Sequence, residues 1–179
     1  MNQRGIAIGQ IFIYIVAAIT FALIMIFGYK MITDFQNKGE AVEFFQFKNN
    51  LETDVKKIYT EYGAIRNLDI RTPTKYSQIC FVNLDLDPQT IPTEFQSLCE
   101  KDYYACEVWQ EAWKNPQNHG YSAVDENVFL TPAVEGQPPI KVYKISLSGE
   151  NQGYLCLPIR QGSFSFTLEG KGDHTEISE

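Results

Sequence analysis

One uninterrupted apolar run constrains the fold of this chain more than any other sequence feature. The 24 residues Ile6–Tyr29 (IAIGQIFIYIVAAITFALIMIFGY) include no Asp, Glu, Lys, Arg or His. At about 1.5 Å of rise per residue, a helix of this length spans roughly 36 Å and can cross a hydrocarbon core of about 30 Å. The helices of a water-soluble domain keep one polar face. We therefore expect residues 6–29 to form a transmembrane helix.

The apolar pattern changes its period after this run. Beyond Asp34 the chain is charged, and apolar residues recur at steps of three and four, as on one face of a helix. The residues on this face are Phe44, Leu51, Val55, Ile58 and Tyr62, with Lys48 as the one polar gap. No Pro interrupts residues 6–62, which favours either one continuous helix that ends before Gly63 or a membrane helix followed by a separate amphipathic helix. Residues 30–63 are in both cases an amphipathic extension.

The charges are distributed unevenly along the chain. All 22 acidic residues lie at or beyond Asp34, where 13 basic residues leave a net charge of −9. This surplus of negative charge argues against nucleic acid as a partner. Arg4 precedes the apolar run and favours a cytoplasmic amino terminus, although Lys30 and Lys38 after the run partly offset that signal. We expect residues 64–179 to form a domain outside the membrane.

The four cysteines all follow the apolar run and predict disulfides. Cys80, Cys99, Cys106 and Cys156 form no CxxC pair or Cys/His cluster of the kind that binds metal, which favours two disulfides in an oxidising compartment. On one straight helix Cys99 and Cys106 would be about 10.5 Å apart, beyond the roughly 7 Å limit for bonded Cα atoms. Either a turn near Lys101 joins these two, or each pairs with a strand cysteine. Of three connectivities, we favour Cys99–Cys106 with Cys80–Cys156.

The remaining pattern is β-rich with one helical segment. Short apolar or β-branched runs between turns predict strands at 78–86, 127–131, 140–147, 154–160 and 163–168, and apolar and polar residues alternate in the third and the fifth of them. We expect helical structure at 93–114 with Thr93 as its N-cap, turns at 64–77 and one edge strand in the tail at 169–179. The predicted fold class is α+β: a long N-terminal helix, transmembrane then amphipathic, followed by an antiparallel β-sandwich or meander domain with a short helical insertion.

The amino terminus resembles that of a known protein family. A short hydrophilic leader, Met1–Gly5, ends in Arg4-Gly5 directly before the apolar helix. This order resembles the class III signal peptides of archaeal type IV pilins and pilin-like proteins. The resemblance implies cleavage between Gly5 and Ile6 by a membrane peptidase, after which the helix anchors or polymerises the subunit. Many of these pilins carry Glu five residues into the mature helix, where this chain has Gln10.

No residue set predicts catalysis, so we do not expect an enzyme. The two histidines, His119 and His174, lie in polar segments, and the glycine-rich turns lack the Lys-Ser/Thr pair of a phosphate loop. Asp85 and Asp87 have D-x-D spacing, but Pro88 follows and nothing completes a calcium loop. We expect no cofactor and no metal.

These observations predict a pilin-like, single-pass membrane or cell-surface structural protein. Its amino terminus would be cytoplasmic and its disulfide-containing domain extracellular, alone or in a surface filament. The expected partners are membrane lipid and either further copies of the chain or other pilin-like subunits. The candidate subunit contacts are Gln10, Phe44, Leu51, Val55 and Ile58. Burial of this face against the chain's own domain is the interpretation that we favour for its outer half. The alternative function is a monomeric membrane-tethered binding or accessory module.

Overall fold

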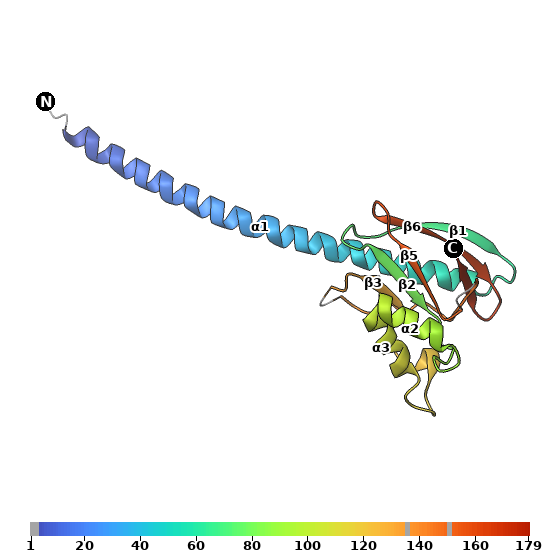
Figure 1. The fold of residues 1–179 in the computed structure, drawn as a ribbon. Helices are drawn as coiled ribbons and strands as arrows, with labels where there is room; N and C mark the ends of the chain where they lie inside the picture. Colours follow the sequence, from blue (N-terminus) through green and yellow to red (C-terminus); the bar gives the residue numbers. More distant parts are fainter. Residues whose placement is uncertain (1–3, 135–136, 150–151) are drawn as a thin grey trace. The chain divides into compact units, whose positions relative to one another are not determined.

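A computed structural model describes residues 4–134, 137–149 and 152–179, without the side chains of residues 4–8 and 34–38. The chain forms two compact units, Met1–Val42 and Glu43–Glu179. Helix α1 (Arg4–Ile58) contributes to both. Helices and two sheets together confirm the predicted α+β class (Figure 1).

The second unit contains two β-sheets. One has the strand order β1-β6-β7-β4 and the other β3-β2-β5. All neighbours are antiparallel except β4 and β7, which are parallel. The strands are β1 (Ile65–Arg71), β2 (Gln78–Val82), β3 (Val128–Thr131), β4 (Ile145–Leu147), β5 (Tyr154–Pro158), β6 (Ser163–Gly170) and β7 (Thr175–Ser178).

The predicted helical insertion lies between β2 and β3. It consists of α2 (Pro92–Lys101), α3 (Tyr103–Ala112) and the short 3₁₀ helix η1 (Gly120–Ser122). The chain breaks at Asp102, as predicted, and the carboxylate of Asp102 caps α3 by accepting the Ala105 N–H at 3.0 Å. The prediction of Thr93 as N-cap is wrong, because Ile91 occupies that position without a side-chain hydrogen bond and Pro92 begins the helix.

Helix α1 ends four residues earlier than the sequence pattern indicates. The helix was expected to reach Tyr62, but it stops at Ile58, and Tyr62 is 84% exposed. The reason is tertiary: the Gly172 N–H donates to the Tyr59 carbonyl at 2.8 Å, so a backbone group beyond β6 binds the end of the helix. Gly63 has a φ of 76° and forms the turn into β1 instead of capping α1.

The predictions for residues 64–77 and for the tail are both wrong. Residues 64–77 were expected to form turns, yet β1 lies there and pairs along its whole length with β6. Its polar residues face solvent on an edge strand, and only Ile70 is buried. The tail was expected to be one edge strand; instead β6 continues to Gly170, and β7 lies inside the sheet between β6 and β4.

The strand predicted at 140–147 is divided between the two sheets. Ile140 forms an isolated bridge with Val128, whereas β4 begins only at Ile145 and pairs with β7. Between them, the buried side chain of Asn127 bonds both backbone groups of Val142: its amide donates to the carbonyl at 3.1 Å, and its oxygen accepts the N–H at 2.9 Å. Where the segment passes from one sheet to the other, the Asn127 side chain therefore makes the hydrogen bonds to Val142 that a neighbouring strand would otherwise make.

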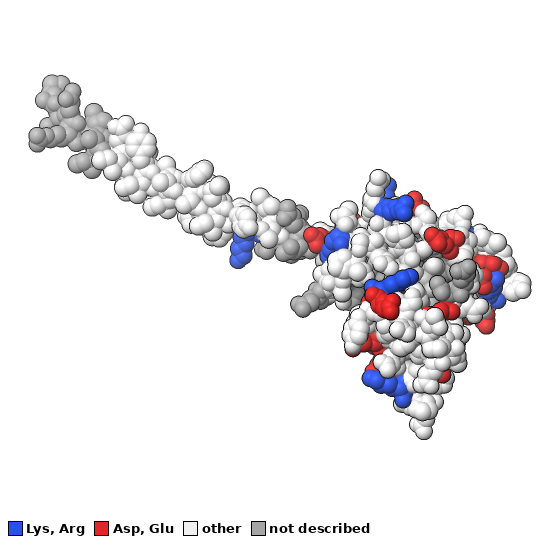
Figure 2. All heavy atoms as spheres, viewed as in Figure 1, with Lys and Arg blue, Asp and Glu red and all other residues white. Residues whose placement is uncertain are grey.

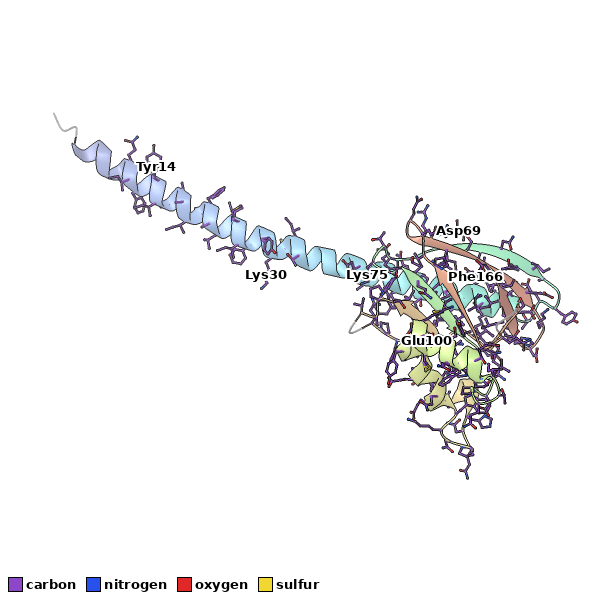
Figure 3. All side chains as sticks on the ribbon, in the orientation of Figure 1. Tyr14, Lys30, Asp69, Lys75, Glu100 and Phe166 are labelled. Atoms are coloured by element: carbon purple, nitrogen blue, oxygen red, sulfur yellow. A yellow bond between two sulfur atoms is a disulfide. The ribbon has the colours of Figure 1, made fainter. Side chains whose placement is uncertain are left out.

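The two faces of the β3-β2-β5 sheet border two hydrophobic cores. The first core joins both sheets to the last part of α1, and Figure 3 labels one of its members, Phe166. The second core lies between the other face of this sheet and helices α2 and α3, with Trp109 completely buried. The C-terminal part of α1 is thus a structural element of the folded unit.

Candidate functional site

The apolar segment of α1 is the first candidate site. By length and composition, residues Gly9–Thr33 form the one helical segment of the described chain that is suited to crossing a membrane, and no residue of its most apolar part is buried. Figure 3 shows Tyr14 and Lys30 extending from the helix, and the apolar segment is almost free of red and blue in Figure 2. An exposed apolar surface of this extent indicates an apolar environment.

The residues predicted at the amino terminus remain largely outside the described part. Met1 to Gln3 of the leader are not described, and only the backbone of Gly5 and Ile6 is, as part of α1. Gln10 is exposed on the helix.

The outer helix face is buried within its own unit. Phe44, Leu51, Val55 and Ile58 are at most 3% exposed and belong to the first core, which confirms the favoured burial against the chain's own domain. Burial in this core accounts for the apolar face without a second subunit. Phe47, 2% exposed, is a further member of this face that the spacing did not identify. Lys48, the polar gap, donates to the Pro139 carbonyl at 2.6 Å and fixes the loop before Ile140.

The two disulfides have the connectivity that the sequence favoured. Cys80–Cys156 joins the paired strands β2 and β5, whose Cα atoms at this position are 4.0 Å apart. Cys99–Cys106 joins α2 to α3 across the break at Asp102, with Cα atoms 4.9 Å apart. Both bonds therefore brace the second unit, and the four cysteines have a structural role.

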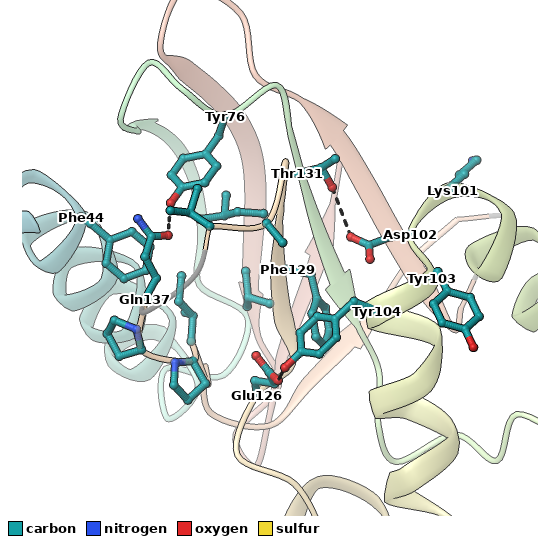
Figure 4. Close-up of a pocket in the computed structure, with 17 residues that line it drawn as sticks. Phe44, Tyr76, Lys101, Asp102, Tyr103, Tyr104, Glu126, Phe129, Thr131 and Gln137 are labelled. Atoms are coloured by element: carbon teal, nitrogen blue, oxygen red, sulfur yellow. Dashed lines mark hydrogen bonds between the residues drawn. The ribbon is translucent and has the colours of Figure 1, made fainter. Parts of the chain in front are cut away.

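A groove along the outer edge of β3 is the second candidate site. Its volume is about 450 Å³, and it runs between the start of α3 and Phe44 of α1 (Figure 4). Tyr103, Tyr104 and Val134 all line it and are 68%, 50% and 38% exposed. Three large side chains thus remain accessible to solvent at a concave surface, which is the usual form of a binding site.

The two carboxylates of the groove, those of Asp102 and Glu126, accept hydrogen bonds from neutral hydroxyl groups. The Tyr104 hydroxyl donates to Glu126, and the Thr131 hydroxyl donates to the Asp102 carboxylate at 3.2 Å. The hydrogen bond to Glu126, assisted by partial burial and by that carboxylate's charge, raises the pKa of Tyr104 to about 12. Tyr103 has its pKa raised chiefly by a hydrogen bond to Glu107. Both tyrosines are therefore neutral donors at physiological pH.

Sequence reasoning did not identify this groove. Its aromatic and acidic members come from five separate segments, and none forms a motif. The one sequence signal for the groove was the pair Tyr103-Tyr104, which places two large aromatic side chains at the start of a helix directly after the break. Among the described residues, no three His, Cys, Asp or Glu side chains gather as metal ligands would.

The comparisons with known proteins identify no family. Neither a protein-family model, nor a curated protein, nor a solved structure matches the chain. One candidate membrane helix together with two disulfides is compatible with a membrane-anchored extracellular protein of a single span.

Proposed function

We propose that this chain is a pilin-like structural protein of the cell surface, which its N-terminal helix anchors in the membrane or packs into a filament. The amino terminus would be cytoplasmic, and the second unit would be extracellular. The class III-like leader with Arg4-Gly5 supports processing before Ile6. The chain's role would be structural, with lipid and further pilin-like subunits as partners.

One observation carries this proposal: the helix that contains the apolar segment also supplies part of the folded core. The segment Gly9–Thr33 of α1 is apolar and unburied, whereas Phe44–Ile58 of α1 supplies the centre of the first core. A hydrophobic span of a transient targeting signal would have no reason to continue into the helix that closes a folded core. Cleavage after the span would separate the anchor from this helix, whereas cleavage before Ile6 would retain both.

Intact-mass measurement and amino-terminal sequencing of the protein from its native membrane test the processing step. We expect a chain that begins at Ile6. The matched control is Gly5→Phe, which places a bulky residue before the bond and should leave the leader attached while the chain remains in the membrane. A wild-type chain that still carries Arg4 would contradict pilin-type processing.

Burial of the outer helix face favours a second candidate function, a monomeric membrane-tethered binding module. Phe44, Leu51, Val55 and Ile58 are used inside the unit, and Gln10 lacks the charge of the Glu that many pilins have there. Sedimentation of the detergent-extracted protein discriminates the two functions. Assemblies held by the apolar segment support a filament, and a monomer at every concentration supports the tethered module.

A further inference from the structure

Strand β3 is an edge strand whose outer side is only partly used. Its inner side pairs with β2, and the Val82 N–H donates to the Asn127 carbonyl in the same ladder. On the outer side, the Val128 N–H donates to the Ile140 carbonyl at 3.2 Å. Backbone groups along an antiparallel strand alternate between its two sides, so Leu130, like Val128, directs its N–H and C=O outward. Within the described residues, no backbone hydrogen bond reaches Leu130 from that side.

The groove lies at this unused position and has two different walls. Phe129 and Thr131 point to the α3 side, where Tyr104 packs on Phe129 with ring centroids 5.8 Å apart. The polar wall of the groove is therefore formed by Asp102, Tyr104 and Glu126. Val128 and Leu130 point to the first core, which also contains Phe44. We call Phe44 and two further apolar lining residues, Val134 and Pro138, the apolar wall of the groove.

The polar wall carries negative charge without a matching cation. In the part of the chain that the structure describes, neither Asp102 nor Glu126 has an ion-pair partner. Their bonded donors are neutral: the hydroxyls of Thr131 and Tyr104, and the Ala105 N–H that Asp102 caps. Lys101 also borders the groove, but its ammonium lies over the Tyr154 ring, 5.2 Å from the centroid. A ligand that brings a positive charge beside this wall would gain electrostatic attraction.

We propose that the groove binds an extended peptide segment of a partner protein, which adds a strand beside Leu130. Successive side chains of a strand point to opposite faces. The segment would therefore alternate apolar residues, against Phe44, Val134 and Pro138, with Lys or Arg against Asp102 and Glu126. Main-chain hydrogen bonds to Leu130 supply the affinity, and the two walls select the alternating pattern. This binding requires neither processing nor polymerisation of the chain.

Calorimetric titration of the full-length protein in nonionic detergent tests the proposal, with the blocked peptide Val-Lys-Val-Lys-Val as probe. We expect this peptide to bind, and the corresponding Val-Glu-Val-Glu-Val peptide and a version with methylated backbone nitrogens to bind at least about tenfold more weakly. Hydrogen exchange measured by mass spectrometry should slow in residues 128–131 when the Lys peptide is present. Equal affinity for the Lys and Glu peptides, or no binding, would overturn the proposal.

A matched pair of variants locates the binding. Asp102→Asn combined with Glu126→Gln keeps the helix cap and the acceptor for Tyr104 but removes both charges, and it should weaken the Lys peptide roughly threefold to tenfold. Asp69→Asn makes the same change at an exposed carboxylate on β1 in the other sheet and should leave the affinity unchanged. An unchanged affinity in the double variant, or an equal loss in Asp69→Asn, would place the peptide elsewhere and refute the proposed site.

Discussion

Gly170 lies where the end of β6 meets the end of α1, and the space there admits no side chain. A Cβ atom at this position would be 2.2 Å from the Ile58 carbonyl oxygen and 2.3 Å from that of Glu61. The Gly170 carbonyl also accepts the Gly63 N–H at 2.8 Å, so the backbone is held at this distance. A single glycine thereby determines how closely the hairpin of β6 and β7 approaches the helix.

Replacing Gly170 with Ala should destabilise the second unit by about 1–3 kcal/mol or more, because backbone and not a flexible side chain would have to move. The free energy of unfolding can be followed by tryptophan fluorescence, since both tryptophans lie on or directly after α3. Gly39→Ala is the control: its Cβ would meet nothing within 4 Å, and in a helix Ala is the better residue. An equal stability in the two variants would contradict the close contact.

Tyr104 and Glu126 should make stability sensitive to alkaline pH. The pKa of Tyr104 is raised to about 12 from an ordinary value of 10.0, so the folded state keeps a proton that the unfolded state loses. The stabilisation is complete below pH 10 and is lost as the pH rises toward 12. The stability difference between wild type and Tyr104→Phe should therefore shrink over that interval. Parallel pH curves for the two proteins would exclude the coupling.

At the scale of elements, the sequence pattern predicted those features that residues close together in the sequence determine. The break between α2 and α3, the disulfide across it and strands β2, β3, β5 and β6 follow from nearby residues. Strands β1 and β7 did not, because their polar residues match no apolar alternation and their pairing depends on β6 and β4. The divided segment between Ile140 and Ile145 depends on Asn127, which no spacing rule identifies. The groove could not be predicted either, because its lining residues come from segments that lie far apart in the sequence.

The two disulfides should contribute unequally to stability. Cys80–Cys156 closes 76 residues of chain and Cys99–Cys106 closes seven, so loop-closure entropy predicts losses of about 4 and about 2 kcal/mol when each pair is replaced by alanine. Chemical denaturation of the two double variants measures this difference. A larger loss for Cys99→Ala with Cys106→Ala would show that the local bond stabilises folded structure directly and would contradict the entropic ranking.

At the scale of the whole molecule, one helix contributes to two units whose surfaces differ in character. Gly9–Thr33 exposes a largely apolar surface in which Lys30 is the one charged residue, and Glu43–Glu179 carries the disulfides and nearly all of the charge. Burial of Leu51, Val55 and Ile58 inside the second unit leaves the apolar segment as the part of α1 that is free to meet lipid or another copy. Anchoring and assembly would then depend on the same segment.

Labelling of Tyr62→Cys with a membrane-impermeant thiol reagent on intact cells tests the proposed arrangement most directly. Tyr62 is 84% exposed in the turn after α1, and the four native cysteines are held in disulfides, so the new thiol is the one reactive group expected on the second unit. With the second unit outside the cell, labelling should be as complete before permeabilisation as after it, and the unsubstituted protein should stay unlabelled. Labelling that appears only after permeabilisation would place this unit inside and contradict a surface-exposed, membrane-anchored protein.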